Sequence, residues 1–92
     1  MPNIEIHGVI TGRETSLRAQ IFELLKDEPF ATDVVVSVEC TATITEDSSR
    51  EKKPFLRVFD SDGGRAYKIG ALLSGALRMD VETMQLRSFH HA

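Results

Sequence analysis

The segment that decides the fold of this chain is Asp33-Val34-Val35-Val36-Ser37-Val38-Glu39-Cys40-Thr41-Ala42-Thr43-Ile44-Thr45. Its β-branched residues are so dense, and the run is so long, that it predicts a strong β-strand. The residues at every second position share one apolar face: Val34, Val36, Val38, Cys40, Ala42 and Ile44. The opposite face turns polar after Val35, so one side of the strand is predicted to be covered and the other to face solvent or a partner.

An amphipathic helix and a first strand precede this segment. The apolar residues that recur at helical spacing are Leu17, Ile21, Leu24 and Leu25. This spacing predicts a helix over residues 14–27, with Thr11 or Thr15 as its N-cap. Further upstream, residues 3–10 alternate between apolar and polar side chains like a half-buried strand, and Gly8 marks a candidate bulge in it.

The same order of elements returns after the central segment. The charged residues 46–53 predict an exposed hairpin tip, and residues 54–59 predict a third strand. A second helix is predicted over residues 65–78, and a shorter fourth strand over residues 81–89. The run Asp60-Ser61-Asp62-Gly63-Gly64 before that helix resembles a cation or phosphate loop only in part, so it predicts an N-cap and a turn.

Two glycines, Gly70 and Gly75, lie inside the second predicted helix. Each costs about 1 kcal/mol of helix stability relative to alanine. We therefore expect both to mark places where this helix packs closely on the sheet.

The predicted order β-α-β-β-α-β assigns the chain to the α+β class as one domain over residues 1–92. Right-handed crossovers would place both helices on one face of a four-stranded mixed sheet. The ferredoxin-like sandwich and the tautomerase superfamily both have this order of elements. The order alone does not separate them.

Composition excludes several classes of function. A net charge of −3 and a pI near 5.5 argue against a nucleic-acid partner. No apolar run approaches the roughly 20 residues of a membrane span, and no signal-peptide layout opens the chain, so we expect no membrane partner and a cytoplasmic location. Cys40 is the only cysteine, which fits a reducing compartment and an inert core thiol. The tail pair His90-His91 has no third ligand at a fixed spacing, so no metal site is expected.

Pro2 stands directly behind Met1, at the head of the strand Pro2-Asn3-Ile4-Glu5-Ile6-His7. If Met1 is removed, Pro2 becomes a secondary amine, and an ordinary α-amino group titrates near about 7.7–8.0. Burial disfavours the charged form of an amine and lowers its pKa, so Pro2 could carry protons at neutral pH. A structural interpretation stays open beside this one, because proline at the head of an edge strand loses no hydrogen bond of the sheet.

The first half of the chain resembles the opening of oxalocrotonate tautomerase. The shared features are a strand led by proline that contains Ile6-His7, a Gly12-Arg13 pair at the strand–helix junction, and a returning strand. The second half is similar to macrophage migration inhibitory factor and its relatives. Its shared features are Tyr67, the run Leu72-Leu73-Ser74-Gly75 and an aspartate, Asp80, before the last strand. The chain thus resembles the tautomerase superfamily over nearly its whole length.

This resemblance implies a keto–enol tautomerase or isomerase that acts on a small keto or enol acid without a cofactor. Pro2 corresponds to the general base, and Arg13 to the junction arginine that holds a substrate carboxylate, although Arg13 lies one residue further along than the family pattern. The family's second arginine maps to Val35, which is a departure from the pattern. The other candidate substrate-binding residues are Arg57, Gln85 and Arg87.

The resemblance also implies a homotrimer in which the polar face of the sheet is buried. A non-catalytic interaction module that binds a partner through this face is the alternative, and the residue at position 35 favours it. Arg13 is then a solvated loop residue, and Arg57 and Arg87 lie on the solvent face or pair with Glu5 and Glu39 across strands. The chemistry also depends on removal of Met1, since an acylated Pro2 nitrogen has no basic lone pair.

Overall fold

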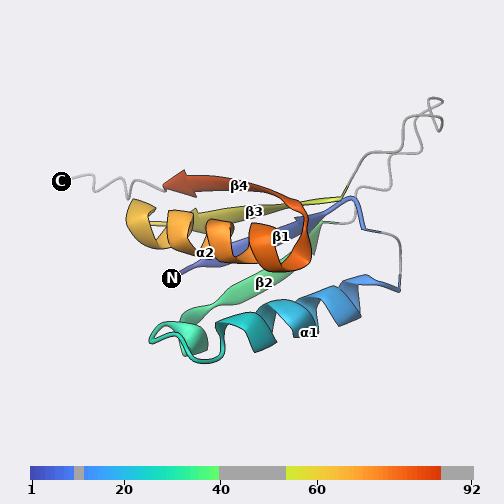
Figure 1. The fold of residues 1–92 in the computed structure, drawn as a ribbon, viewed down its shortest axis with the longest axis horizontal. Coiled ribbons are helices and arrows are strands. Elements are labelled where there is room, and N and C mark those ends of the chain that lie inside the picture. The colour runs from blue at the N-terminus through green and yellow to red at the C-terminus, as the bar shows by residue number, and fades with distance from the viewer. Residues whose placement is uncertain (10–11, 40–53, 86–92) are drawn as a thin grey trace.

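Two β-α-β units form the structure, which is a computed structural model that describes residues 1–9, 12–39 and 54–85 (Figure 1). The elements are β1 (Asn3–His7), α1 (Glu14–Leu25), a short 3-10 helix (Ala31–Asp33), β2 (Val35–Glu39), β3 (Phe55–Asp60), α2 (Gly63–Leu77) and β4 (Asp80–Gln85). The predicted α+β class and the order β-α-β-β-α-β are confirmed.

The sheet is mixed, and its strand order is β2-β1-β3-β4. β1 pairs in parallel with β2, β3 pairs in parallel with β4, and β1 and β3 meet in the middle as antiparallel neighbours. In a ferredoxin-like sheet the two parallel strands of each β-α-β unit are split by a third strand. Here they are direct neighbours in both units, so the sheet does not have the ferredoxin-like order.

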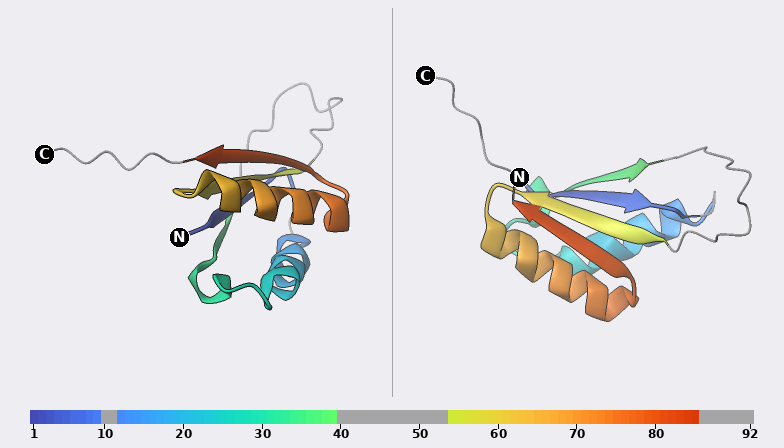
Figure 2. Two further views of the ribbon diagram at one scale, coloured as in Figure 1. Left: turned by 60° about the vertical axis from the view of Figure 1, so that its left-hand side comes forward. Right: turned by 90° about the horizontal axis from the view of Figure 1, so that it is seen from above.

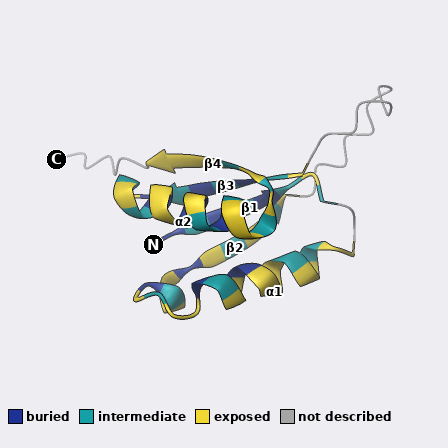
Figure 3. Cartoon of the chain, viewed as in Figure 1, coloured by how far each residue is buried: buried dark blue, intermediate teal, exposed yellow. Residues whose placement is uncertain are grey.

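Both helices cover the same face of the sheet, as the sequence predicts (Figure 2). Ile4 and Ile6 of β1 and Leu56 and Val58 of β3 point into this layer and are fully buried. The helices close over them with Ile21, Leu25, Ala66, Ile69 and Leu73. The buried residues therefore lie between the sheet and the helices, and the other sheet face remains partly exposed (Figure 3).

Several predicted boundaries are corrected by the backbone. β1 ends at His7 because Gly8 has a φ of 71°, the left-handed region that favours glycine, so Gly8 ends the strand and forms no bulge within it. Thr15 does not cap α1, and Thr11 lies outside the described residues. Arg13 occupies the N-cap position without a side-chain hydrogen bond, and Thr15 lies within the first turn. The backbone N–H of Gly12 instead donates to the Glu14 carboxylate at 2.6 Å.

α2 begins at Gly63, two residues before the predicted start, and Asp62 caps it as expected: the Arg65 backbone N–H donates to Asp62 Oδ1 at 3.1 Å. The close approach predicted for Gly70 is confirmed, because a β-carbon there would lie 2.3 Å from Thr83 Cγ2. The same expectation for Gly75 is wrong, since a β-carbon there would have no atom within 4 Å.

Several predictions concern residues 40–53 and 86–92 and lie outside the described residues. They include the thiol environment of Cys40, the hairpin tip, the placement of Arg87 and the histidine tail. In the part of the chain that the structure describes, no helix is both long enough and apolar enough to span a bilayer.

Candidate functional site at the Pro2 end of the sheet

Pro2 lies at one end of the sheet, beside two polar residues from neighbouring strands. β1 and β3 pair so that Asn3 is opposite Phe59, and continuing this register by one residue places Pro2 opposite Asp60. Across the next pair of strands, Asp60 is opposite Gln85. On the other side, the Val35 backbone N–H donates to the Pro2 carbonyl at 2.9 Å. The sheet therefore brings Pro2, Asp60 and Gln85 into one row, which we call the Pro2 row.

Asp60 is the buried charge of this row, with no accessible surface. Arg65, in the first turn of α2, donates to it from both Nε and Nη2, and the Nη2–Oδ1 distance is 2.7 Å. The Asp62 backbone N–H adds a third hydrogen bond to Asp60 Oδ1, at 3.1 Å. A carboxylate with this many donors satisfies the requirement that a buried charge be both paired and hydrogen-bonded.

The Arg65 guanidinium is held between two elements. Besides its contact with Asp60 it lies over the ring of Phe30, with Cζ 5.7 Å from the ring centroid. The hydrogen bond from Arg65 lowers the pKa of Asp60 below its usual value of 3.8, against the opposing effect of burial. The same contact raises the pKa of Arg65. Both groups are therefore charged at neutral pH.

The N-terminal ammonium lies beside the same carboxylate. The Met1 nitrogen is 3.9 Å from Asp60 Oδ1. The Asn3 side-chain amide donates to the Met1 carbonyl at 3.2 Å. The start of the chain is thus held next to a fixed negative charge, while the Pro2 side chain is fully buried.

Gln85 lies at the same end of the sheet as Pro2, opposite Asp60. Its amide nitrogen donates to the Ser61 carbonyl at 3.2 Å. Its side chain also packs on the turn before α2, where a β-carbon on Gly63 would lie 2.8 Å from Gln85 Oε1. Glycine at position 63 therefore makes room for this side chain.

The structure does not bring Arg13 or Arg57 to the Pro2 row. Arg13 precedes α1, at the end of β1 opposite to Pro2 (Figure 1). Arg57 lies on the sheet face away from the helices, where its Nε donates to Glu82 at 2.9 Å. The expected partners of Arg57, Glu5 and Glu39, are wrong, because its hydrogen bond goes to Glu82. Glu5 lies opposite Arg57 in the register, and the hydrogen bond goes to the neighbour on the other side.

The face away from the helices, which we call the outer face, carries three cross-strand rows. In order from β2 to β4 they are Val35, Asn3, Phe59 and Met84; Ser37, Glu5, Arg57 and Glu82; and Glu39, His7, Phe55 and Asp80. The His7 and Phe55 rings stack with centroids 4.6 Å apart, and His7 Nε2 is 2.9 Å from Glu5 Oε1. Val35 and Met84 are exposed at its two edges. Aromatic and charged side chains thus share a surface that neither helix covers.

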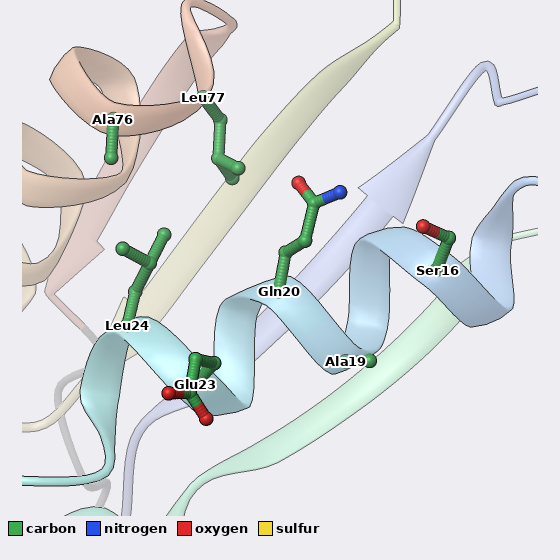
Figure 4. A pocket seen from close by; sticks show the side chains of 7 residues that line it. All are labelled: Ser16, Ala19, Gln20, Glu23, Leu24, Ala76 and Leu77. Atoms are coloured by element: carbon green, nitrogen blue, oxygen red, sulfur yellow. The ribbon is translucent and has the colours of Figure 1, made fainter.

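A separate groove lies between the two helices, with a volume of 520 Å³. Its walls come from α1 and the end of α2: Ser16, Ala19, Gln20, Glu23, Leu24, Ala76 and Leu77 (Figure 4). No candidate site residue lines it. Within the described ranges, no three His, Cys, Asp or Glu side chains gather closely enough to hold a metal ion.

Asp60 and Arg65 are not among the residues that the sequence predicts for the site. The local pattern predicts a turn before the second helix at Asp60, and it predicts no role for Arg65. The signal in the sequence is an aspartate at the end of a strand, with an arginine five residues later in the first turn of a helix. It becomes informative only when the aspartate is known to face the helix layer.

Comparison with known proteins supports the fold alone. No family model matches the chain, and no curated protein matches it. Among solved structures, the chain is similar to the crystal structure of a domain of unknown function (DUF1904) from Sebaldella termitidis ATCC 33386. The two are 14% identical, the match covers 99% of this chain and 95% of that chain, and the TM-score is 0.65. At this identity the likeness shows a common fold.

Proposed function

We propose that this small α+β domain is a cofactor-free keto–enol tautomerase or isomerase whose general base is the amine of Pro2 after removal of Met1. The observation that carries the proposal is the Pro2 row, in which the first residue after Met1 is buried beside a fixed carboxylate and a polar amide. The direct parallel pairing of strands in both halves agrees with the doubled β-α-β unit on which the resemblance to the tautomerase superfamily rests.

Keto–enol tautomerisation requires one group that accepts a proton and returns it to another atom of the substrate. A secondary amine at Pro2 has a lone pair for this step, whereas an amide nitrogen bonded to Met1 has none. A small keto or enol acid also needs a cation for its carboxylate. Among the residues that the structure describes, Arg65 supplies the guanidinium at this end of the sheet, and Asp60 engages its Nε and Nη2, so Nη1 can bind the substrate carboxylate.

We propose further that the domain assembles as a homotrimer through its outer face. Phe55 and Phe59 are only half-buried there, and Val35 is 43% and Met84 48% exposed. Aromatic and methionine side chains are enriched in protein interfaces. Sedimentation of the purified protein tests this assembly, and a monomer at all concentrations contradicts it.

A non-catalytic interaction module is the second candidate. Two placements favour it: Val35, at the position of the family's second arginine, is exposed on the outer face, and Arg13 lies at the far end of β1 from Pro2. In this function the outer face binds a partner, and the Pro2 row serves only to close the end of the core.

The intact mass of protein from its native host is the first experiment that separates the two. Loss of Met1 is expected from the enzyme, and a uniform mass that retains Met1 excludes Pro2 as a base. The second experiment is ketonisation of phenylenolpyruvate or a hydroxymuconate by the Met1-free protein and by Pro2→Ala. General-base catalysis contributes about 10²–10⁴-fold, and Pro2→Ala replaces the rigid secondary amine with a flexible primary amine, so kcat/KM should fall by part of that factor.

The matched control is Pro54→Ala, because Pro54 is an exposed proline before β3, at the end of that strand away from Asp60. Its rate should equal that of the wild type. Equal rates for wild type and Pro2→Ala would remove the secondary amine of Pro2 from the mechanism, and no turnover by either protein would leave the interaction module.

A further inference from the structure

Asp60 has more charged neighbours than the capping of a turn requires. Its buried carboxylate is fixed by two hydrogen bonds from Arg65, and the N-terminal ammonium stands 3.9 Å from the oxygen Oδ1. Arginine alone would satisfy the charge of the carboxylate. The approach of a second cation therefore needs its own explanation.

We propose that Asp60 is a positioning residue that binds the N-terminal amine as its counter-ion, and that after loss of Met1 it holds the amine of Pro2 and sets how much of it is protonated. This inference rests on the proposed function for its catalytic meaning, but the contact itself does not require activity. Removal of Met1 transfers the terminal charge by one residue, to Pro2, which lies opposite Asp60 when the register of β1 and β3 is continued by one residue beyond Asn3 and Phe59.

The geometry makes the carboxylate a fixed point for this charge. Directly opposite residues of an antiparallel pair have Cα atoms about 4.5–5.5 Å apart. Arg65 and the Asp62 backbone N–H hold the carboxylate oxygens in place, so Asp60 does not have to reorganise when the charge arrives. A carboxylate at this range favours the protonated amine, while burial of Pro2 favours the neutral one.

All the charged groups near the amine enter this balance. β3 contributes Asp60, and α2 contributes Arg65, whose positive charge opposes protonation of the amine. Asp62 and Asp33 act on Arg65 and weaken that opposition. Within the described residues, β2 and β4 place the uncharged Val35 and Gln85 beside Pro2 and Asp60. Asp60 and Arg65 therefore have opposite effects on the same amine.

In the proposed reaction, Pro2 and Asp60 therefore have different roles. Pro2 accepts and returns the proton, and Asp60 decides the pH at which the amine is free to accept it. Loss of the carboxylate should shift the rising limb of the activity profile to lower pH, and loss of the guanidinium should shift it to higher pH.

The test measures the amine itself. Chloroacetamide alkylates an unprotonated amine: a C–N bond forms, chloride leaves, and the amine proton goes to water. Protein that begins at Pro2, verified by intact mass and prepared by aminopeptidase treatment where Met1 is retained, is alkylated over a range of pH. The rate is read on the N-terminal peptide by mass spectrometry, which separates it from reaction at Cys40.

At pH 7, Asp60→Asn should be alkylated about threefold to tenfold faster than wild type, because its amine is protonated less. Arg65→Gln should react more slowly than wild type. Asp33→Asn is the matched control, since it removes a carboxylate that acts on Arg65 only at a distance, and its rate should stay within about twofold of wild type.

Identical pH profiles for wild type and Asp60→Asn would overturn the inference. If Asp60→Asn does not fold, Arg65→Gln decides alone, and a rate equal to or above that of wild type overturns the inference. These results are independent of the proposed function. Shifted profiles in a protein that turns over no enol would contradict the enzyme and leave Asp60 as the counter-ion. Turnover with unshifted profiles would support the enzyme and contradict the role of Asp60 as counter-ion.

Discussion

Two ion pairs, made by Arg57 and Asp60 of β3, differ because these residues lie on opposite faces of the sheet. Arg57 points to the outer face and pairs with Glu82, where the side chains are 39% and 58% exposed. Three residues later, Asp60 faces the helix layer and pairs with Arg65. The Asp60 side chain is 0% exposed and the Arg65 side chain is 30% exposed. Exposed pairs contribute about 0–1 kcal/mol, whereas removing one partner of a buried pair leaves an uncompensated charge. Both pairs use a residue of β3, and their burial determines how much each contributes to stability.

The largest effect should come from breaking the buried pair. Asp60→Ala removes the acceptor of both Arg65 and the Asp62 backbone N–H, and it should lower the free energy of unfolding by about 2–4 kcal/mol. Urea denaturation measures this loss. Ser61→Ala is the control, because Ser61 is exposed and uses only its backbone carbonyl to bind Gln85. A loss below about 1 kcal/mol would place the buried pair in the same class as the exposed one.

The glycines of α2 extend the comparison to packing. Gly70→Ala introduces a β-carbon 2.3 Å from Thr83 Cγ2, so it should cost about 1–2 kcal/mol after its gain in helix propensity. Gly75→Ala meets no atom within 4 Å and should stabilise the protein by up to about 1 kcal/mol. If α2 packs on β4 as described, thermal unfolding should show a lower Tm than wild type for Gly70→Ala and a higher Tm for Gly75→Ala. Equal signs would contradict that packing.

Acid should weaken the buried pair by titration. Because the hydrogen bond from Arg65 holds the pKa of Asp60 below 3.8, the pair contributes its full stability above pH 3.8 and loses it as the pH falls through the folded-state pKa. The free energy of unfolding should therefore decrease as the pH falls below 3.8. The effect is smaller than that of Asp60→Ala, since a protonated carboxyl still fills its site. Urea titrations should show a shallower acid slope for Asp60→Asn than for wild type, and the wild-type slope for Ser61→Ala. An unchanged slope in Asp60→Asn would contradict the assignment.

The order of elements followed from periodicity alone, because alternation along strands and the three-to-four spacing along helices are properties of local sequence. The outward direction of Arg57 was predictable for the same reason. The strand order did not follow from periodicity, since two folds have the same order of elements. The burial of Asp60 was not predictable, since it depends on Arg65 of α2, and the run Asp60-Ser61-Asp62-Gly63-Gly64 has the local signature of a turn. Gly75 shows the opposite error: a glycine in a helix indicated close packing, and the structure has open space beside it.

The smallest effect is expected on the outer face, and it separates an open surface from a covered one. Glu82→Gln removes the partner of Arg57 and should change the unfolding free energy of a monomer by less than about 1 kcal/mol, because water replaces the lost contact. In an assembly that covers the outer face, the same change leaves the guanidinium desolvated and unpaired, and the cost rises. Urea denaturation at low and high protein concentration therefore distinguishes the two states. A small, concentration-independent change means that the outer face is open in solution, and a larger loss that appears only at high concentration means that further copies of the chain cover it.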